Sequence, residues 1–310
     1  MRVKVLGSAA GGGFPQWNCA CPNCRRVRRG ELKGRARTQA QIAVSPGDSS
    51  WLLLNASPDL RQQILEDPEF DPAQGARSSP ISAIILTSAD TDCVMGLLHL
   101  REFQPLRIYA TEAVRRIVTE ENSVFRTLER SSPPVEWNDL ALDRPTAVFH
   151  GAECGERGDV LCRAVPLGAE FPDYLSDALR RELRREQAVI GLQLVRGEKK
   201  IFYAPSLPAD GDEWRRRAEE SDLAILDGTF WTDDELVNVR GSGKTARQMG
   251  HLPLSGADGL LEQLRRGSKA RRVLIHMNNT NPVLDEESPA SAAVRDAGWE
   301  VAYDGMEFQL

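Results

Sequence analysis

Three cysteines, Cys19, Cys21 and Cys24, lie within six residues of one another, soon after the glycine-rich turn Gly11–Gly13. Thiols at positions i, i+2 and i+5 of a tight loop can point at one centre, and Zn²⁺ commonly takes tetrahedral thiolate sets. The alternative is a chance cluster of free or disulfide-bonded cysteines, which is disfavoured because residues so close in sequence seldom meet disulfide geometry. We therefore predict a zinc knot at residues 18–24, with its fourth ligand supplied from elsewhere.

A second group of candidate ligands follows the apolar run Ile81–Leu86. Asp90, Asp92 and Cys93 stand there in a polar loop that leads into a helical pattern, and carboxylates and thiolates are both anionic metal ligands. The competing interpretation is a helix N-terminus, in which the two aspartates cap the first turn and the cysteine is buried as a small hydrophobic residue. Spacing alone leaves both interpretations open.

The chain has four histidines, and two of them, His251 and His276, stand at boundaries between elements where an active site can form. His99 falls instead on a helical pattern, and His150 ends a strand pattern. A single histidine is more often structural than catalytic. Two histidines at the boundaries between elements and loops, together with an acidic loop elsewhere in the chain, favour a metal site.

The length and composition are those of a globular protein of the size of an enzyme. With 310 residues and 41% hydrophobic content, the chain can bury a full core. Its N-terminus reads as a strand and not as a signal peptide, and no window approaches the apolar length of a membrane span, so we expect a cytoplasmic protein that does not enter a membrane. Six cysteines, three of them clustered, suit a reducing compartment, and we expect no disulfides.

A net charge of −6 conceals a basic run between Arg25 and Arg37. Such a run can bind phosphates or an acidic peptide. We favour a solvated helix face, because the rest of the chain is acidic and no aromatic stacking platform accompanies the run. Nucleic acid is therefore not an expected partner.

The elements that must position these residues follow an α/β rhythm, in which short apolar runs alternate with helical patterns. The predicted strands are Met1–Gly7, Gln41–Val44, Trp51–Asn55, Ile81–Leu86, Leu106–Ala110, Thr146–His150, Leu161–Pro166, Ile190–Val195, Lys200–Tyr203, Leu223–Leu226, Arg272–His276 and Trp299–Tyr303. The predicted helices are Pro58–Leu65, Val94–Glu102, Glu112–Glu120, Tyr174–Glu186, Asp212–Glu220, Gly256–Arg266 and Pro289–Ala297. This order favours two sheets between helix layers over one doubly wound parallel sheet. No repeat or linker divides the chain, so we predict one domain, residues 1–310.

Five motifs spread over nearly the whole chain carry a family resemblance: Gly7–Cys19, Asn55–Arg61, Gly250–Pro253, Asn278–Pro282 and Asp304–Met306. Together they resemble the coenzyme PQQ synthesis protein B family of the metallo-β-lactamase superfamily. The resemblance implies an α+β fold, the four-layer αββα sandwich of that superfamily. It also implies a role in making the redox cofactor pyrroloquinoline quinone (PQQ), and a structural Zn²⁺ held by the three clustered cysteines.

The chain departs from the hydrolytic branches of the superfamily, in which the loop after the strand reads His-x-His-x-Asp-His and supports Zn²⁺ ions that activate water. The first two histidine positions fall on Ser88 and Asp90. The aspartate is kept as Asp92, and the last histidine is Cys93. The aspartate that bridges two metals would fall near Ser206. Too few imidazole and bridging ligands remain for a dinuclear hydrolase.

The residues that remain are Asp90, Asp92, His251 and His276, joined by Cys93. They approach a mononuclear set of two histidines and a carboxylate, which suits Fe²⁺, with another divalent metal as the alternative. Asp92 and His276 are then ligands, Asp90 a ligand or orienting group, and His251 a ligand or proton-transfer group. The thiol of Cys93 is either a further ligand that recruits Zn²⁺ or a site of oxidation.

The resemblance implies an iron-dependent oxygenase that hydroxylates the tyrosine ring of a peptide-derived precursor carrying Glu and Tyr. The alternatives are a non-catalytic carrier, for transport of PQQ or its precursor, and a metal-dependent hydrolase. Expected partners are that precursor or PQQ itself and other PQQ biosynthesis proteins, and a homodimer is left open. For the fourth zinc ligand, Asn279, Asp285 and a water are all open, because Asn279 stands where phosphodiesterase relatives with the same thiol cluster have a histidine.

Overall fold

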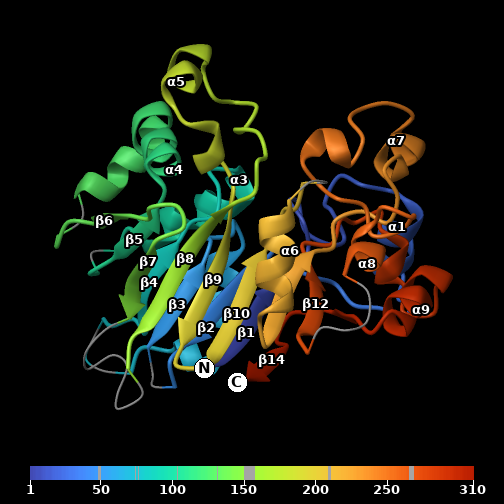
Figure 1. Cartoon of the computed structure of the whole chain (residues 1–310), viewed down its shortest axis with the longest axis horizontal. Coiled ribbons are helices and arrows are strands. Elements are labelled where there is room, and N and C mark those ends of the chain that lie inside the picture. The colour runs from blue at the N-terminus through green and yellow to red at the C-terminus, as the bar shows by residue number, and fades with distance from the viewer. Residues whose placement is uncertain are drawn as a thin grey trace. The chain divides into compact units, whose positions relative to one another are not determined.

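The computed structural model describes residues 1–47, 50–73, 75, 77–102, 104–130, 132–149, 158–208, 211–264 and 269–310. Their contacts divide the chain into two compact units. The first unit is Met1–Leu6, Gln41–Lys199 and Gly305–Leu310, and the second is Gly7–Ala40 and Lys200–Asp304. The strands form two mixed sheets that carry helices, which is the predicted α+β fold (Figure 1).

The first sheet belongs to the first unit and has the strand order β14-β1-β2-β3-β4-β5-β6. These strands are β1 (Arg2–Gly7), β2 (Gln41–Ser45), β3 (Trp51–Leu54), β4 (Ile81–Ile85), β5 (Arg107–Ala110), β6 (Glu136–Asp139) and β14 (Glu307–Gln309). The strands β3 to β6 run parallel, while β14 is antiparallel to β1 and β2 to β3. Every residue of β2 and β3 is buried, as expected for strands covered on both faces.

The remaining strands are antiparallel in the first unit and parallel in the second. The first unit holds β7 (Pro145–Phe149), β8 (Val160–Pro166) and β9 (Ile190–Arg196). The second unit holds β10 (Lys199–Ala204), β11 (Leu223–Asp227), β12 (Arg271–Ile275) and β13 (Glu300–Val301). Because β10 to β13 are parallel, the residues that follow them emerge at one edge of the sheet.

Short helices connect the strands. They are α1 (Pro22–Arg28), α2 (Leu60–Leu65), α3 (Thr91–Val94), α4 (Glu112–Arg116), α5 (Asp177–Glu182), α6 (Asp212–Glu219), α7 (Glu235–Arg240), α8 (Leu260–Gln263) and α9 (Pro289–Asp296). Several begin at capping side chains, as where Ser288 accepts a hydrogen bond from the backbone of Ser291 in α9. No helix of the described residues is long and apolar enough to span a membrane.

The predicted strands are present, but two strands, β6 and β14, were not expected. Both are short, and each has exposed residues at its two ends, so neither contains an apolar run. The helix α7 was likewise absent from the predicted set, whereas α1 carries the start of the basic run for which a helix face was favoured. His150 and Cys154 lie outside the described residues.

The helix predicted at Val94–Glu102 begins earlier, at Thr91, and tightens into a 3₁₀ helix over Met95–Leu100. Gly96 explains the close packing there. A Cβ on Gly96 would lie 2.2 Å from the carbonyl oxygen of Ser57, and its N–H donates to the carbonyl of Ala56 (2.8 Å). Only glycine lets the two backbones approach this closely.

Candidate metal centres

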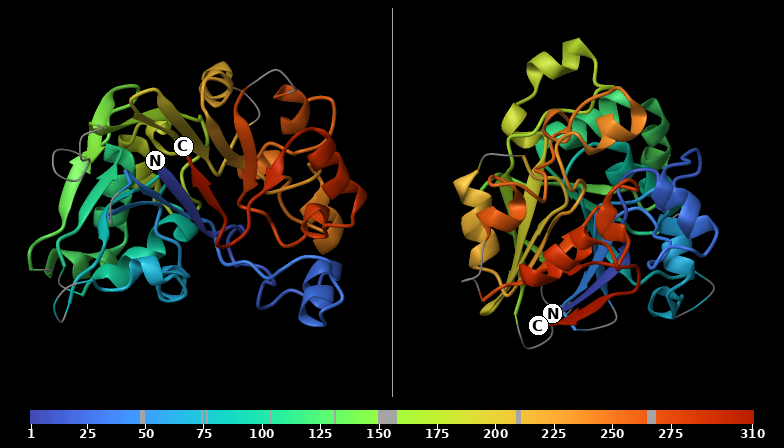
Figure 2. Two further views of the ribbon diagram at one scale, coloured as in Figure 1. Left: turned by 90° about the horizontal axis from the view of Figure 1, so that it is seen from below. Right: turned by 90° about the vertical axis from the view of Figure 1, so that its right-hand side faces the viewer.

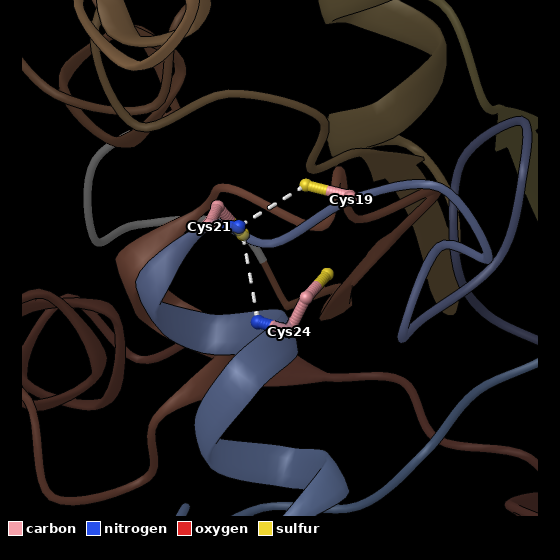
Figure 3. Close-up of side chains that lie close together, drawn as sticks. All are labelled: Cys19, Cys21 and Cys24. Atoms are coloured by element: carbon pink, nitrogen blue, oxygen red, sulfur yellow. Dashed lines mark hydrogen bonds between the residues drawn. The ribbon is translucent and has the colours of Figure 1, made fainter.

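The three clustered cysteines gather around one point at the start of α1 (Figure 3). Cys21 is the N-cap residue, and Pro22 occupies the first helical position, where its lack of an N–H costs nothing. The backbone N–H of Cys24 donates to the sulfur of Cys21 (3.5 Å), and that of Cys21 donates to the sulfur of Cys19 (3.4 Å). The turn of the helix therefore aims the thiols inward.

The side-chain amide of Asn279 lies among the three sulfurs, with its Nδ2 atom 3.1 Å from Cys19, 3.6 Å from Cys21 and 3.4 Å from Cys24. It is buried and reaches the cluster from the loop that follows β12. Asp285, another candidate fourth ligand, pairs instead with Arg26 at 2.6 Å. Of the two protein groups left open by the sequence, Asn279 is the one placed at the thiols.

The thiols differ in acidity. Burial raises the pKa of Cys24 to about 12. Burial also acts to raise the pKa of Cys19, but hydrogen bonds from Cys21, Cys24 and Asn279 outweigh it, and the net direction is downward. A metal ion would have to displace the proton of Cys24, so binding at the knot would release acid.

The knot is tied to the loop after β12 by a second side chain. Asn23 donates to the carbonyl of Asn279 (3.2 Å) and to that of Asn281 (2.9 Å). Asn281 in turn donates to the carbonyl of Gly228, which follows β11 (2.9 Å). These bonds join α1 to the ends of β11 and β12.

A second cluster stands at those strand ends and consists of Asp227, His251 and His276, whose ligand atoms all lie within 4.8 Å of one another. Asp227 is the last residue of β11 and His276 follows β12, so the parallel pairing of the two strands brings them together. His251 comes from the loop after the 3₁₀ helix Arg247–Met249. The two imidazole rings stack, with centroids 5.5 Å apart and an interplanar angle of 23°.

Asp227 is fully buried and surrounded by donors. Its Oδ2 accepts from the backbone N–H of Leu207 (2.9 Å) and lies 2.8 Å from Nδ1 of His251. Its Oδ1 accepts from the backbone N–H of Thr229 (3.0 Å) and from the hydroxyl of the same residue (2.6 Å). Burial alone would raise the pKa of Asp227, but the two histidines and Thr229 outweigh it and lower the pKa.

His276 has an unusual backbone for its residue type. Its φ of 62° lies in the left-handed region, which costs energy in a residue with a Cβ. Its Nδ1 lies 2.8 Å from the hydroxyl of Thr229. Strained non-glycine residues of this kind cluster at functional sites, and here the strain accompanies the turn of the imidazole toward His251.

Asp90, Asp92 and Cys93 lie together in the first unit, soon after β4, with Asp90 at the N-cap of α3 and Asp92 and Cys93 within that helix. Asp90 is the N-cap residue of α3 but makes no side-chain capping bond, and its carboxylate accepts from the hydroxyl of Ser88 (2.7 Å). This observation weighs against the capping interpretation for Asp90. Burial and the two neighbouring carboxylates raise the pKa of Cys93, so its thiol is neutral in the metal-free loop.

The loop that carries these residues is held from two directions within the first unit. The side-chain oxygen of Asn55 accepts from the backbone of Thr87 (2.8 Å). The hydroxyl of Tyr174 donates to the carbonyl of Ala89. Burial raises the pKa of Tyr174 to about 12, so this phenol stays protonated and keeps its donor.

Sequence reasoning singled out the two histidines but missed Asp227 and Thr229. The signal was present, because both follow directly on the apolar strand at residues 223–226. A polar residue at the carboxyl end of a parallel strand is a site candidate on topological grounds. Nothing in the sequence says which neighbouring strand end it meets.

Comparisons with known proteins place this fold. The β-lactamase superfamily domain matches residues 50–277. Coenzyme PQQ synthesis protein B of Azoarcus sp. is 44% identical to this chain, and that of Nitrosococcus oceani is 42% identical, each alignment covering 100% of both chains. The Zn²⁺-bound PqqB of Methylobacterium extorquens superposes with a TM-score of 0.90 at 38% identity, over 100% of both chains.

A diphosphatase of the PhnP family superposes less closely, with a TM-score of 0.66 at 18% identity, over 100% of this chain and 97% of that one, and shows the shared fold alone. The full-length likeness at 40% identity or more confirms the resemblance seen in the motifs. The chain belongs to the coenzyme PQQ synthesis protein B family, within the β-lactamase superfamily.

Proposed function

We propose that this chain acts in the synthesis of PQQ, as the name of its relatives states, and that it is a metal-dependent oxygenase. The substrate is a peptide-derived precursor that carries Glu and Tyr, and the reaction hydroxylates the tyrosine ring. One atom of O₂ replaces a ring hydrogen as hydroxyl, the other leaves as water, and a soluble two-electron reductant supplies the electrons.

The observation that carries the proposal is the pair of imidazoles His251 and His276, stacked beside the buried carboxylate of Asp227. Two neutral imidazoles combined with a carboxylate ligand suit Fe²⁺, with Asp92 as the carboxylate that the resemblance implies. When bound, the iron would supply the activation of O₂. The lost histidines at Ser88, Asp90 and Cys93 weigh against the water-activating hydrolase alternative.

The residues of the chain have separate tasks in this proposal. His276 and Asp92 bind the metal, and His251 binds it or carries a proton to or from the substrate. Asp90, held by the hydroxyl of Ser88, orients the loop or adds a ligand. Cys93, a neutral thiol before metal binding, becomes a ligand only on losing its proton.

We further propose that Cys19, Cys21 and Cys24 hold a structural Zn²⁺. The side chain of Asn279 closes the site through its amide oxygen after the amide turns over, because Nδ2 is the atom that faces the sulfurs in the structure. The placement of that amide among the three sulfurs supports this assignment. The crystallised relative is Zn²⁺-bound, which supports zinc as the ion. Anomalous scattering at the zinc and iron absorption edges on one crystal would count both sites and identify each ion.

The test of the oxygenase uses protein loaded with Fe²⁺ under argon, a Glu- and Tyr-containing peptide, a reductant and then O₂. We expect the peptide to gain one oxygen atom, measured by mass spectrometry with ¹⁸O₂. His276→Ala and Asp92→Ala should each abolish turnover, while His99→Ala, an exposed histidine of the first unit, should retain it. Full turnover in the Asp92→Ala His276→Ala double variant would contradict the assignment.

The carrier alternative makes a different prediction, because a carrier binds PQQ or its precursor tightly without metal or O₂. Equilibrium binding of PQQ to protein lacking iron therefore separates the two functions. Association with other proteins of PQQ synthesis, or with a second copy, stays a prediction from the family.

A further inference from the structure

The cluster of Asp227, His251 and His276 has the composition of a three-ligand metal site, but its hydrogen bonds assign the carboxylate a different task. We propose that Asp227 is a positioning residue. Two hydrogen-bonded connections, here called arms, run from Asp227 to His251 and through Thr229 to His276. They hold both histidines in one tautomer, with the proton on Nδ1 and a lone pair on Nε2. Binding of the active-site metal by these lone pairs rests on the proposed function. The tautomer itself does not.

The hydrogen bonds at Asp227 already use the full capacity of its carboxylate to accept. An ionised carboxylate has about four lone-pair sites and no donor. Asp227 meets four donor positions: the backbone N–H groups of Leu207 and Thr229, the hydroxyl of Thr229 and Nδ1 of His251. Binding a metal would require the loss of one of these bonds inside a fully buried pocket. The carboxylate is therefore already satisfied by the protein.

The first arm runs directly to His251. A carboxylate oxygen can only accept, so a 2.8 Å contact between Oδ2 and Nδ1 requires the proton to lie on Nδ1 of His251. In the neutral ring, the second nitrogen, Nε2, then carries the lone pair. A hydrogen bond at one nitrogen of a histidine fixes the chemistry of the other in this way.

The second arm runs through Thr229 to His276. The hydroxyl oxygen of Thr229 lies 2.6 Å from Oδ1 of Asp227, 2.9 Å from the carbonyl oxygen of His276 and 2.8 Å from Nδ1 of the same histidine. The hydroxyl has one proton, and two of these three neighbours only accept. Donation to Asp227, at the shortest distance, leaves the hydroxyl lone pairs to accept from Nδ1–H of His276.

Both arms thus lead to the same tautomer. If Nδ1 of His276 lacked its proton, the Thr229 hydroxyl would face three acceptors with one proton, and Asp227 or the ring would lose its partner. That arrangement would cost about 1–3 kcal/mol for each buried group left unsatisfied. A carboxylate behind a ligating histidine is a common arrangement at metal sites, where it fixes the ring and raises its basicity. Here one carboxylate serves two rings.

The test reads the tautomer directly by long-range ¹H–¹⁵N correlation on uniformly ¹⁵N-labelled protein, which distinguishes protonated from unprotonated ring nitrogens. The chain has four histidines. Single His99→Gln and His150→Gln variants identify the signals of those two residues, so the remaining signals belong to His251 and His276. We expect protonated Nδ1 and unprotonated Nε2 for both His251 and His276 at pH 8. A proton on Nε2 of either ring would overturn the proposal, whether or not the protein hydroxylates any peptide.

Three variants separate positioning from a merely structural role. Thr229→Val keeps the shape but removes the hydroxyl, so only the His276 signals should change. Thr229→Ser restores the hydroxyl and should restore them. Asp227→Asn replaces one acceptor by a donor and should alter both rings. If Thr229→Val and Asp227→Asn both leave the two tautomers as in the parent, with folding verified by circular dichroism, the hydrogen bonds of Asp227 and Thr229 do not set the tautomers.

The same variants predict metal affinity. Loss of a hydrogen-bonded partner behind a ligating histidine typically weakens metal binding about 10- to 100-fold. We expect Thr229→Val to bind Co²⁺ more weakly by this factor, and Thr229→Ser to bind it as the parent does. Co²⁺ binding is measured by its visible absorption, after the thiol knot has been filled with Zn²⁺. If the tautomers are as expected but Thr229→Val leaves Co²⁺ affinity unchanged, the positioning stands but the metal does not bind His276, which contradicts the proposed function instead.

Discussion

At the scale of single residues, the loop after β12 depends on a buried acid that takes no part in the proposed chemistry. Glu235, the first residue of α7, accepts from the hydroxyl of Thr280 (2.5 Å) and from the backbone of Trp231 (2.6 Å). Burial raises the pKa of Glu235 to about 7. Near neutral pH, the loop that carries Asn279 therefore rests on a carboxyl group that is half ionised.

This carboxyl group makes stability depend on pH. The folded pKa lies above the ordinary value of 4.5, so the native state binds more protons between these values and its stability falls as the pH rises through about 7. The full loss of stability is about 3.5 kcal/mol, at about 1.4 kcal/mol per pKa unit. We expect Glu235→Gln, which cannot ionise, to lose less stability between pH 5 and pH 8 than the parent, measured by urea unfolding.

The matched control is Asp212→Asn, whose side chain is fully exposed. The free energy of unfolding of this variant should depend on pH in the same way as that of the parent. If that of Glu235→Gln also does so, the buried carboxyl group does not titrate in this range.

At the scale of elements, α1 is too short to be stable by itself. It has seven residues, no acidic side chain in its first turn, and only Cys24 buried. Isolated helices of this length do not form in water. Its stability must come from the knot at its N-terminus and from the bonds that Asn23 makes to the loop after β12.

Comparison of variants at two buried cysteines separates the loss of a zinc ligand from the loss of a buried sulfur. Cys24 and Cys162 are both fully buried, and only Cys24 belongs to the knot. We expect Cys24→Ala to lose bound zinc, measured per chain by mass spectrometry of the elements, and to unfold at a lower temperature that no longer responds to a chelator. Cys162→Ala should lose packing energy but keep its zinc. Equal zinc content in the two variants would show that the three clustered cysteines do not bind the zinc.

At the scale of the whole molecule, the two ends of the chain meet. The N-terminal amine donates to the carbonyl of Leu310 (2.9 Å), and β14 pairs antiparallel with β1, so that both termini lie side by side (Figure 2). Both ends belong to the first unit. The last strand covers an edge that would otherwise expose unpaired backbone groups.

Deletion of residues 307–310 should therefore uncover β1. We expect a lower unfolding temperature and a larger fraction of aggregate on size-exclusion chromatography, because an exposed edge strand recruits other chains. Substitution of the exposed Gln309 by Ala within the intact strand is the control, since it keeps the backbone pairing and leaves the ion pair of Glu307 with Lys4 intact. A truncated chain as stable and as monodisperse as that control would show that β14 does not protect the edge.

Much of the fold and of the thiol cluster could be predicted from residues that lie close together in the sequence. Residue types and spacing were enough to bring Cys19, Cys21 and Cys24 together, because three residues in one tight turn meet whatever the rest of the chain does. Apolar runs predicted most strands, since a strand buried on both faces must be apolar along its length. The short edge strands β6 and β14 were missed because backbone pairing, and not side-chain burial, defines them.

The tertiary structure decided which distant residues share a site. Asp227 and His276 stand 49 positions apart in sequence and meet because β11 and β12 are parallel neighbours. Asn279 reaches the thiols, and Asp285 pairs with Arg26, although both follow the same strand. The sequence alone determined the ligand types and the family motifs. Only the pairing of strands, which depends on contacts between residues far apart in the chain, determined that one buried carboxylate lies behind both histidines.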